Sequence, residues 1–197
     1  MYRIGRFVIL ASALACASGS KTHLTDSWRE PSTTQLAFKR TLVVYMSPNA
    51  AARHEVEDRL ASRIPNGVPA YRAIPDLSHT DPAQARQQLQ GQGFDGVVAR
   101  RVVAVEQTGD YVPGSNWYAS KRGFDAFWGP SWVVVEDPGY RVDNRVVTVE
   151  TRIFSIPENR LVWAGRTQTE NPKSVDKLVE STADAVGSQL REQGLIR

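Results

Sequence analysis

RVVTVETRIFSIPENRLVWAGRTQ, residues 145–168, is the stretch of sequence on which the fold depends. Apolar and polar side chains alternate over 145–156, which is the pattern of a half-buried strand. Residues 157–159 (PEN) are typical of a turn, and a second β-rich segment follows at 160–168. The whole stretch therefore predicts an antiparallel β-hairpin.

Three further strands are expected upstream of the hairpin. Residues 41–46 (TLVVYM) suit a short, buried central strand, and 95–107 (DGVVARRVVAVEQ) suit a longer one. Between them, 69–74 are predicted to form a strand near an edge, because prolines flank it. Helical patterns separate these strands, and the resulting order β-α-β-α-β favours parallel pairing through right-handed crossovers.

Capping residues and apolar periodicity predict three helices. Ser47 begins the first, which ends at Asn66. Asp81 begins the second, which is closed by Gly91. Ser174 precedes the last helix, whose apolar stripe should pack on the sheet. That stripe consists of Val175, Leu178, Val179, Thr182, Ala183, Val186 and Leu190.

The predicted fold class is therefore α/β, with α+β character in the C-terminal half. We expect one domain over residues 41–197, with an insert at 108–144. Its sheet should be single and mixed, in the order β-α-β-α-β-(aromatic insert)-β-β-α, with helices mainly on one face. A domain of this length buries enough surface on folding to need no disulfide or metal.

Residues 1–16 have the features of a signal peptide with a lipobox. An apolar run at 7–14 (FVILASAL) leads into the lipidation and cleavage signal ALAC at 13–16. Cys16, the only cysteine, is the predicted lipid-attachment residue, and its acyl chains would make the membrane a partner. Cleavage at the A-x-A sequence 15–17, which would release a soluble periplasmic protein, stays open as the alternative.

Residues 17–40 are polar, rich in Ser and Thr, and without periodicity. They are predicted to be a tether. Trp28 is unusual in such a segment, so we expect its indole to dock on the domain. Ala17, rather than an aspartate, follows the cysteine, which favours the periplasmic face of the outer membrane.

Charge and motif content argue against several function classes. The net charge is +3, and removal of the two arginines in the signal peptide leaves +1, without the basic patch that nucleic-acid binding needs. The three histidines lack metal-ligand spacing, and a single cysteine cannot build a zinc site. No nucleophile elbow, P-loop or dinucleotide-binding motif occurs. We therefore predict no catalytic residue, no metal, no cofactor and no nucleic-acid partner.

Residues 109–141, within the insert, hold eight of the 17 aromatic residues. A connection this long is usually functional or disordered, and disordered segments lack aromatics. Two interpretations remain: a flap that covers the domain's own sheet, or a recognition surface for an envelope protein, a glycan or the membrane interface. The possible partner-binding residues are Trp117, Tyr118, Phe124, Phe127 and Trp128.

Charged residues inside the predicted strands are the remaining hint of a polar site. They are Arg100, Glu106, Glu150, Arg152 and Arg166. Opposite charges that face each other across strands need no active site, and an uncovered sheet face is expected to be polar. A ligand-binding sheet face is the alternative.

Five short motifs run through the mature chain: SWREP (27–31), GFDGV (93–97), PGY (138–140), LVWAG (161–165) and GLI (194–196). Together they resemble a group of bacterial lipoproteins that carry a domain of unknown function. The layout is also similar to the α/β domains of the curli-secretion lipoprotein and of penicillin-binding-protein activators. The resemblance implies an envelope location and supplies no catalytic residues.

We therefore expect a non-enzymatic envelope lipoprotein that binds a partner or scaffolds an assembly. Its specificity and oligomeric state do not follow from the sequence. A subunit of an outer-membrane secretion or assembly complex is the first alternative. A hydrolase of cell wall or lipid is the second, and it would need carboxylates that converge in a cleft.

Overall fold

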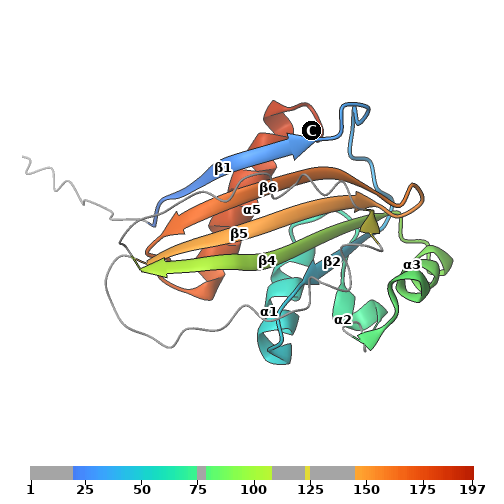
Figure 1. Ribbon diagram of the computed structural model, residues 1–197, viewed down its shortest axis with the longest axis horizontal. Coiled ribbons are helices and arrows are strands. Elements are labelled where there is room, and N and C mark those ends of the chain that lie inside the picture. Colours follow the sequence, from blue (N-terminus) through green and yellow to red (C-terminus); the bar gives the residue numbers. More distant parts are fainter. Residues whose placement is uncertain (1–19, 75–78, 108–122, 125–144) are drawn as a thin grey trace, which may run out of the picture.

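The computed structural model describes residues 20–74, 79–107, 123–124 and 145–197, which form one six-stranded mixed sheet with helices packed on it (Figure 1). The order across the sheet is β1-β6-β5-β4-β2-β3. The predicted α/β class with a single mixed sheet is confirmed. The strands are β1 (Thr22–Arg29), β2 (Thr41–Tyr45), β3 (Gly67–Pro69), β4 (Gly96–Gln107), β5 (Arg145–Ser155) and β6 (Arg160–Glu170), and the helices are α1 (Ala50–Ala61), α2 (Ala70–Ala73), α3 (Pro82–Gly91) and α5 (Val175–Glu192).

The hairpin predicted at 145–168 lies in the interior of the sheet, between β1 and β4. β5 and β6 pair antiparallel, and Asn159 in the turn between them has a φ of 47°, a left-handed conformation that asparagine tolerates. β4 pairs antiparallel with the other edge of β5. β2 runs parallel to both β4 and β3, as the β-α-β-α-β order predicts. The sheet therefore changes from parallel to antiparallel pairing at β4.

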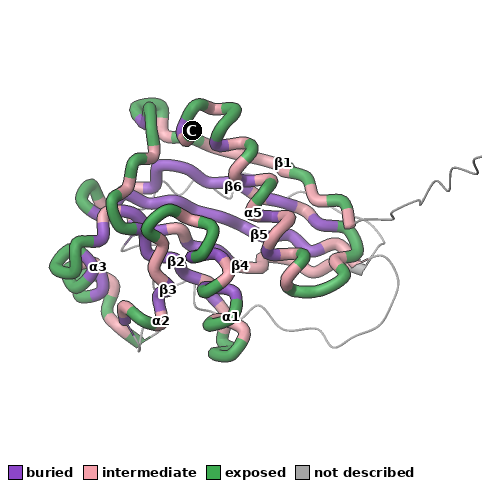
Figure 2. The backbone as a smooth tube through the Cα atoms, turned by 180° about the vertical axis from the view of Figure 1, so that it is seen from behind, coloured by how far each residue is buried: buried purple, intermediate pink, exposed green. Residues whose placement is uncertain are grey.

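Side chains that alternate along the strands give the sheet two differently covered faces. The two longest helices, α1 and α5, lie on one face, where they pack on Val43 and Trp163; Figure 2 views the molecule from this side. We call it the α1/α5 face. α2 and α3 pack on the opposite face with Leu42 and Val97, and we call that the α3 face.

Trp163 is the largest fully buried side chain of the protein's described part. Its indole Nε1 donates a hydrogen bond to Gln193 Oε1 at 2.9 Å, so the one polar atom of the ring is satisfied beneath α5. The ring lies over Gly165, where an added Cβ would stand 2.2 Å from it. The LVWAG motif thus has a packing reason: glycine leaves the space that the tryptophan fills.

Residues 22–29, predicted as part of a tether, form β1 at the edge of the sheet, so the tether prediction is wrong for this segment. β1 pairs antiparallel with β6, from Thr22 opposite Thr169 to Arg29 opposite Trp163. Its residues are half-buried or exposed, and an edge strand of this kind has no apolar run that would reveal it. Trp28 packs against the core, which confirms that its indole docks on the domain.

The strand predicted at 69–74 is also wrong in part. β3 comprises only Gly67–Pro69, and α2 follows directly. The carboxylate of Glu57 on α1 accepts a hydrogen bond from the backbone amide of Tyr71 at 2.9 Å. Tyr71 lies in the first turn of α2, and a carboxylate at the N-terminus of a helix accepts from amides that have no partner within the helix. Glu57 therefore favours a helical turn over a strand at this point.

Two of the three predicted helices begin at the capping residue that the sequence indicated. Asp81 and Ser174 cap α3 and α5 through their side chains, as predicted. The first helix is capped by Asn49 instead of Ser47, and it ends five residues before the predicted end. On α5, Val175 is 54% exposed and does not belong to the buried stripe. In the portion of the chain that the structure describes, no helix is long and apolar enough to span a membrane.

Candidate ligand-binding cleft

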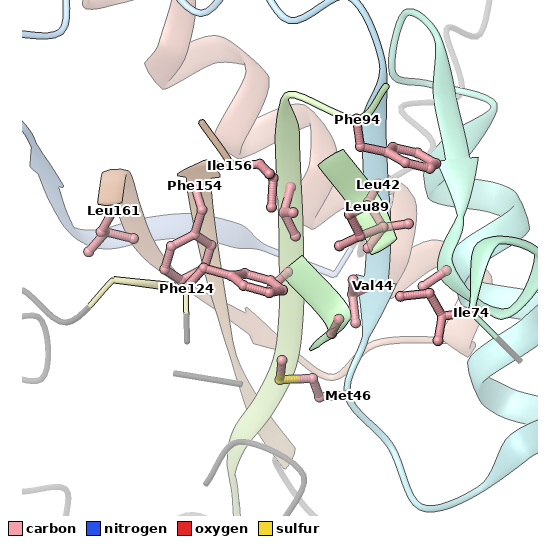
Figure 3. Packing of buried hydrophobic residues seen from close by; sticks show 14 of the residues in the cluster. Leu42, Val44, Met46, Ile74, Leu89, Phe94, Phe124, Phe154, Ile156 and Leu161 are labelled. Atoms are coloured by element: carbon pink, nitrogen blue, oxygen red, sulfur yellow. The ribbon is translucent and has the colours of Figure 1, made fainter. Parts of the chain in front are cut away.

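Phe124 is the one candidate partner-binding aromatic that the structure describes, and it is buried. It is 0% exposed and meets Phe154 edge to face, with ring centroids 6.0 Å apart, inside the core of the α3 face (Figure 3). The prediction that it contacts a partner is wrong, because its ring covers the domain's own sheet. Trp117, Tyr118, Phe127, Trp128 and the lipid-attachment residue Cys16 lie outside the described residues.

The charged residues of the predicted strands separate onto the two faces of the sheet. On the α3 face, Glu150 accepts hydrogen bonds from Arg152, whose Nη2 lies 2.9 Å from Oε1, and from Arg101. Arg166 lies opposite Glu150 on β6. Arg100 is on the other face, opposite Thr151 on β5. The prediction of cross-strand charge pairs therefore holds for the α3 face, and Arg100 needs a different account.

A cleft of about 610 Å³ opens on the α1/α5 face. Its floor is the sheet, and the end of α1 and the second half of α5 form its walls. Residues 35–38 and the end of the chain close the remaining sides. Its volume is within the range of about 300–1,000 Å³ found for small-molecule sites. Its apolar lining includes Leu36, Phe38, Leu60, Ile153, Val186 and Leu190.

Arg100 and Thr151 lie side by side in the floor of this cleft. They are 4% and 1% exposed. Arg100 Nη1 donates to Thr182 Oγ1 on α5 at 3.2 Å, while Arg100 Nε and Thr151 Oγ1 have no hydrogen-bond partner among the described residues. Two adjacent buried polar groups thus keep unused hydrogen-bonding capacity, which native proteins rarely leave unmet.

The electrostatics of the floor are those of an uncompensated positive charge. Burial, together with the positive charge of Arg63, lowers the pKa of Arg100 to about 10, so the guanidinium stays protonated at neutral pH. Arg63 itself forms an ion pair with Asp184, which is the one carboxylate side chain of the described cleft lining. Across the described residues, no acidic side chain forms an ion pair with Arg100.

The arrangement suits non-covalent binding of an apolar ligand with one polar end. An apolar wall excludes water, and a buried guanidinium strengthens any hydrogen bond to an anion in that setting. Gly187 on α5 leaves part of the wall without a side chain, and an added Cβ there would meet Arg191 only at an ordinary 3.5 Å.

Sequence reasoning named Arg100 but missed its meaning. Arg100 and Arg101 are adjacent on one strand, so their side chains must point to opposite faces. One of those faces was predicted to be covered by helices. That juxtaposition indicates that one of the two arginines lies beneath helices, and the structure identifies it as Arg100.

Glu57, on α1, is a second buried charge that the sequence did not reveal. Its carboxylate is 0% exposed and accepts from the backbone amides of Tyr45 (3.1 Å) and Tyr71 (2.9 Å). Burial raises the pKa of Glu57 to about 7, although these amides and the charge of Arg53 lower it. Because both oxygens are engaged by backbone, Glu57 has a structural role.

Metal-ligating side chains do not gather at the cleft or elsewhere in the described ranges, where no three His, Cys, Asp or Glu residues form a group that could hold an ion.

The sequence matches no protein-family model and no curated protein. Among solved structures, the chain is similar to the PelC dodecamer from Paraburkholderia phytofirmans, with 14% identity over 91% of this chain and 100% of that one, and a TM-score of 0.41. It is also similar to the lipoprotein GNA1162 from Neisseria meningitidis, with 15% identity over 78% of this chain and 98% of that one, and a TM-score of 0.38. At these values the similarity is a distant likeness in the path of the chain.

Proposed function

We propose that this protein is an envelope lipoprotein, anchored through Cys16, that binds a small ligand non-covalently in the cleft of the α1/α5 face. The observation that carries the binding function is the cleft itself: a space of about 610 Å³ with apolar walls and a buried, uncompensated arginine in its floor. Burial of such a charge lowers the stability of the ligand-free protein. A bound ligand that accepts a hydrogen bond from the arginine would offset this cost.

Side chains in the cleft favour binding over catalysis. Hydrolysis by acid–base chemistry needs a histidine or paired carboxylates within reach of the substrate. The described lining contains no histidine or cysteine, and Asp184 is engaged by Arg63. The polar groups of the floor, Arg100 and Thr151, donate hydrogen bonds, and neither is a general base.

The anchor is tested by fractionation of cells that express the wild type or Cys16→Ser. The signal ALAC at 13–16 predicts that the wild type incorporates labelled palmitate and sediments with membranes. The variant should lose the label and become soluble or stay unprocessed. Equal membrane association and labelling of both proteins would contradict the lipid anchor.

The binding function is tested with an environment-sensitive apolar fluorophore, N-phenyl-1-naphthylamine. Gly187→Phe adds a ring to the wall of the cleft and should abolish the fluorescence increase that the wild type produces. Val175→Phe adds the same ring at an exposed position of the same helix and should leave the increase intact. Circular dichroism melting establishes that both variants fold. Probe binding that is unaffected by Gly187→Phe, or absent from the wild type, would refute the cleft as the binding site.

A further inference from the structure

We infer that the ligand of the cleft is an anionic amphiphile, an acyl chain that ends in a carboxylate or phosphate, with Arg100 binding the anionic headgroup. The inference rests on the proposed binding function and specifies its ligand class. It follows from the placement of one buried charge and two unused hydrogen-bonding atoms in the floor, beside the apolar side chains that make up much of the lining.

The charge of the ligand follows from Arg100. Arginine donates hydrogen bonds and accepts none, so the partner of its free Nε must be an acceptor. Thr182 Oγ1 accepts from Arg100 Nη1 and lies 2.7 Å from Leu178 O, to which it can donate its own proton. The floor therefore retains its full positive charge, and an oxyanion is the acceptor that compensates it best.

The size of the headgroup follows from Thr151. Its unpartnered Oγ1 neighbours Arg100 across β4 and β5, so the two residues present donors to one small region. A carboxylate or a phosphate can accept from both. A sugar or a peptide carries many more polar groups, and those that faced the apolar side chains of the lining would lack partners.

The acyl chain follows from the walls. Ile153 lies in the floor, and Phe38, Leu60, Val186 and Leu190 surround it on different sides, so a flexible hydrocarbon chain can bury its length against them. Burial of a methylene group contributes roughly 0.8 kcal/mol, which a free inorganic anion cannot gain. Arg63 is paired with Asp184, and the other two lining arginines, Arg191 and Arg197, are exposed. Arg100 is the buried guanidinium of the lining, so it is the charge that we expect to discriminate headgroups.

The experiment is displacement of N-phenyl-1-naphthylamine from the full mature protein by ligands of one chain length, below their micellar concentrations. The ligands are laurate, dodecyl phosphate, dodecanol and dodecylammonium. Laurate, dodecyl phosphate or both should displace the probe at concentrations about 10- to 100-fold lower than dodecanol, because a hydrogen-bonded charge pair is added. The stronger of the two anions identifies the headgroup, and inorganic phosphate or acetate alone should not displace the probe.

Arg100→Met should remove the preference for anions and leave displacement by dodecanol unchanged. Arg101→Met removes the same charge from the neighbouring residue, which faces the other side of the sheet, and should keep the preference. Arg100→Lys, which keeps the positive charge, should retain part of the preference for anions that Arg100→Met loses. The comparison of laurate with dodecanol on the wild type needs no variant to fold.

Equal displacement by dodecanol and both anions, or an anion preference that survives Arg100→Met, would overturn this inference while binding of the probe still supported the proposed function. Failure of the probe to bind the wild type would overturn both.

Discussion

Strands β4 and β5 bury positive charge on both faces of the sheet, but in two different ways. On the α3 face, Arg152 is 5% exposed and paired with Glu150. On the α1/α5 face, Arg100 is 4% exposed, and its one hydrogen-bond partner in the described structure is the hydroxyl of Thr182. Burial is the same, so burial does not distinguish a structural charge from a binding group. The presence or absence of a counter-charge does.

The largest change in the free energy of unfolding is expected when the buried ion pair of Glu150 with Arg152 is broken. Glu150→Gln removes the counter-charge, so Arg152 would be a buried arginine without a carboxylate partner, as Arg100 is among the described residues. The free energy of unfolding should fall by about 3–5 kcal/mol in urea denaturation. Glu158→Gln, which breaks the exposed ion pair with Arg160, is the matched control and should cost less than about 1 kcal/mol. Similar losses for both variants would show that Glu150 is no essential counter-charge.

Glu57 extends the comparison to a buried charge held by backbone amides. Its pKa is about 7 in the folded protein and 4.5 is its ordinary value, so the folded chain holds more protons between these pH values. The free energy of unfolding should therefore fall as pH rises from 4.5 to 7, by about 3 kcal/mol at ~1.36 kcal/mol per pKa unit. The difference between wild type and Glu57→Gln, measured by urea denaturation across this range, isolates the contribution of Glu57. A constant difference would contradict the raised pKa.

Substitution of Arg100 in the ligand-free protein is expected to raise the free energy of unfolding, whereas substitution of Glu150 lowers it. Arg100→Met replaces an uncompensated charge with an apolar side chain and should raise the free energy of unfolding by about 1–3 kcal/mol. Arg152→Met, at the equivalent depth on the other face, leaves Glu150 with fewer partners and should lower it. Destabilisation by both substitutions would assign Arg100 a structural role and remove the contrast between the faces.

The smallest change in stability is expected for a substitution at Gly187 in the wall of the cleft. Gly187→Ala should stabilise the protein by about 0.5–1 kcal/mol, because α5 gains helix propensity and the new methyl group meets no close neighbour. Gly165→Ala is the contrasting variant, since its Cβ would overlap the ring of Trp163 and should destabilise the protein. Thermal melting of both variants checks the prediction, and a loss of stability in Gly187→Ala would mean that the wall has no free space.

Local chemistry made most of the fold predictable. The alternation at 145–156 and the turn at 157–159 specified the hairpin, and Asp81 and Ser174 specified two helix starts. β1 escaped prediction because an edge strand buries little and can be as polar as a linker. α2 escaped because its first turn is stabilised by Glu57, a residue contributed by another helix.

The candidate site was less predictable for a related reason. Arg100 was visible as a charge inside a strand, and the alternation with Arg101 placed the two on opposite faces. What sequence could not supply is which face leaves a charge without a partner. That depends on Thr151, Thr182 and the packing of α5 over this part of the sheet, which only the tertiary fold brings together.

The position of β1 would also limit how far the domain stood from a membrane if Cys16 carried acyl chains, as proposed above. Thr22 hydrogen-bonds Ser181 on α5 at 2.8 Å, and the wall of the cleft begins two residues further along that helix, at Ala183. The chain from Cys16 to Thr22 spans at most roughly 22 Å. An acyl anchor on Cys16 would therefore hold the domain against the bilayer with the cleft near the lipid surface, so that ligand exchange would proceed over a short path along the membrane instead of through bulk water.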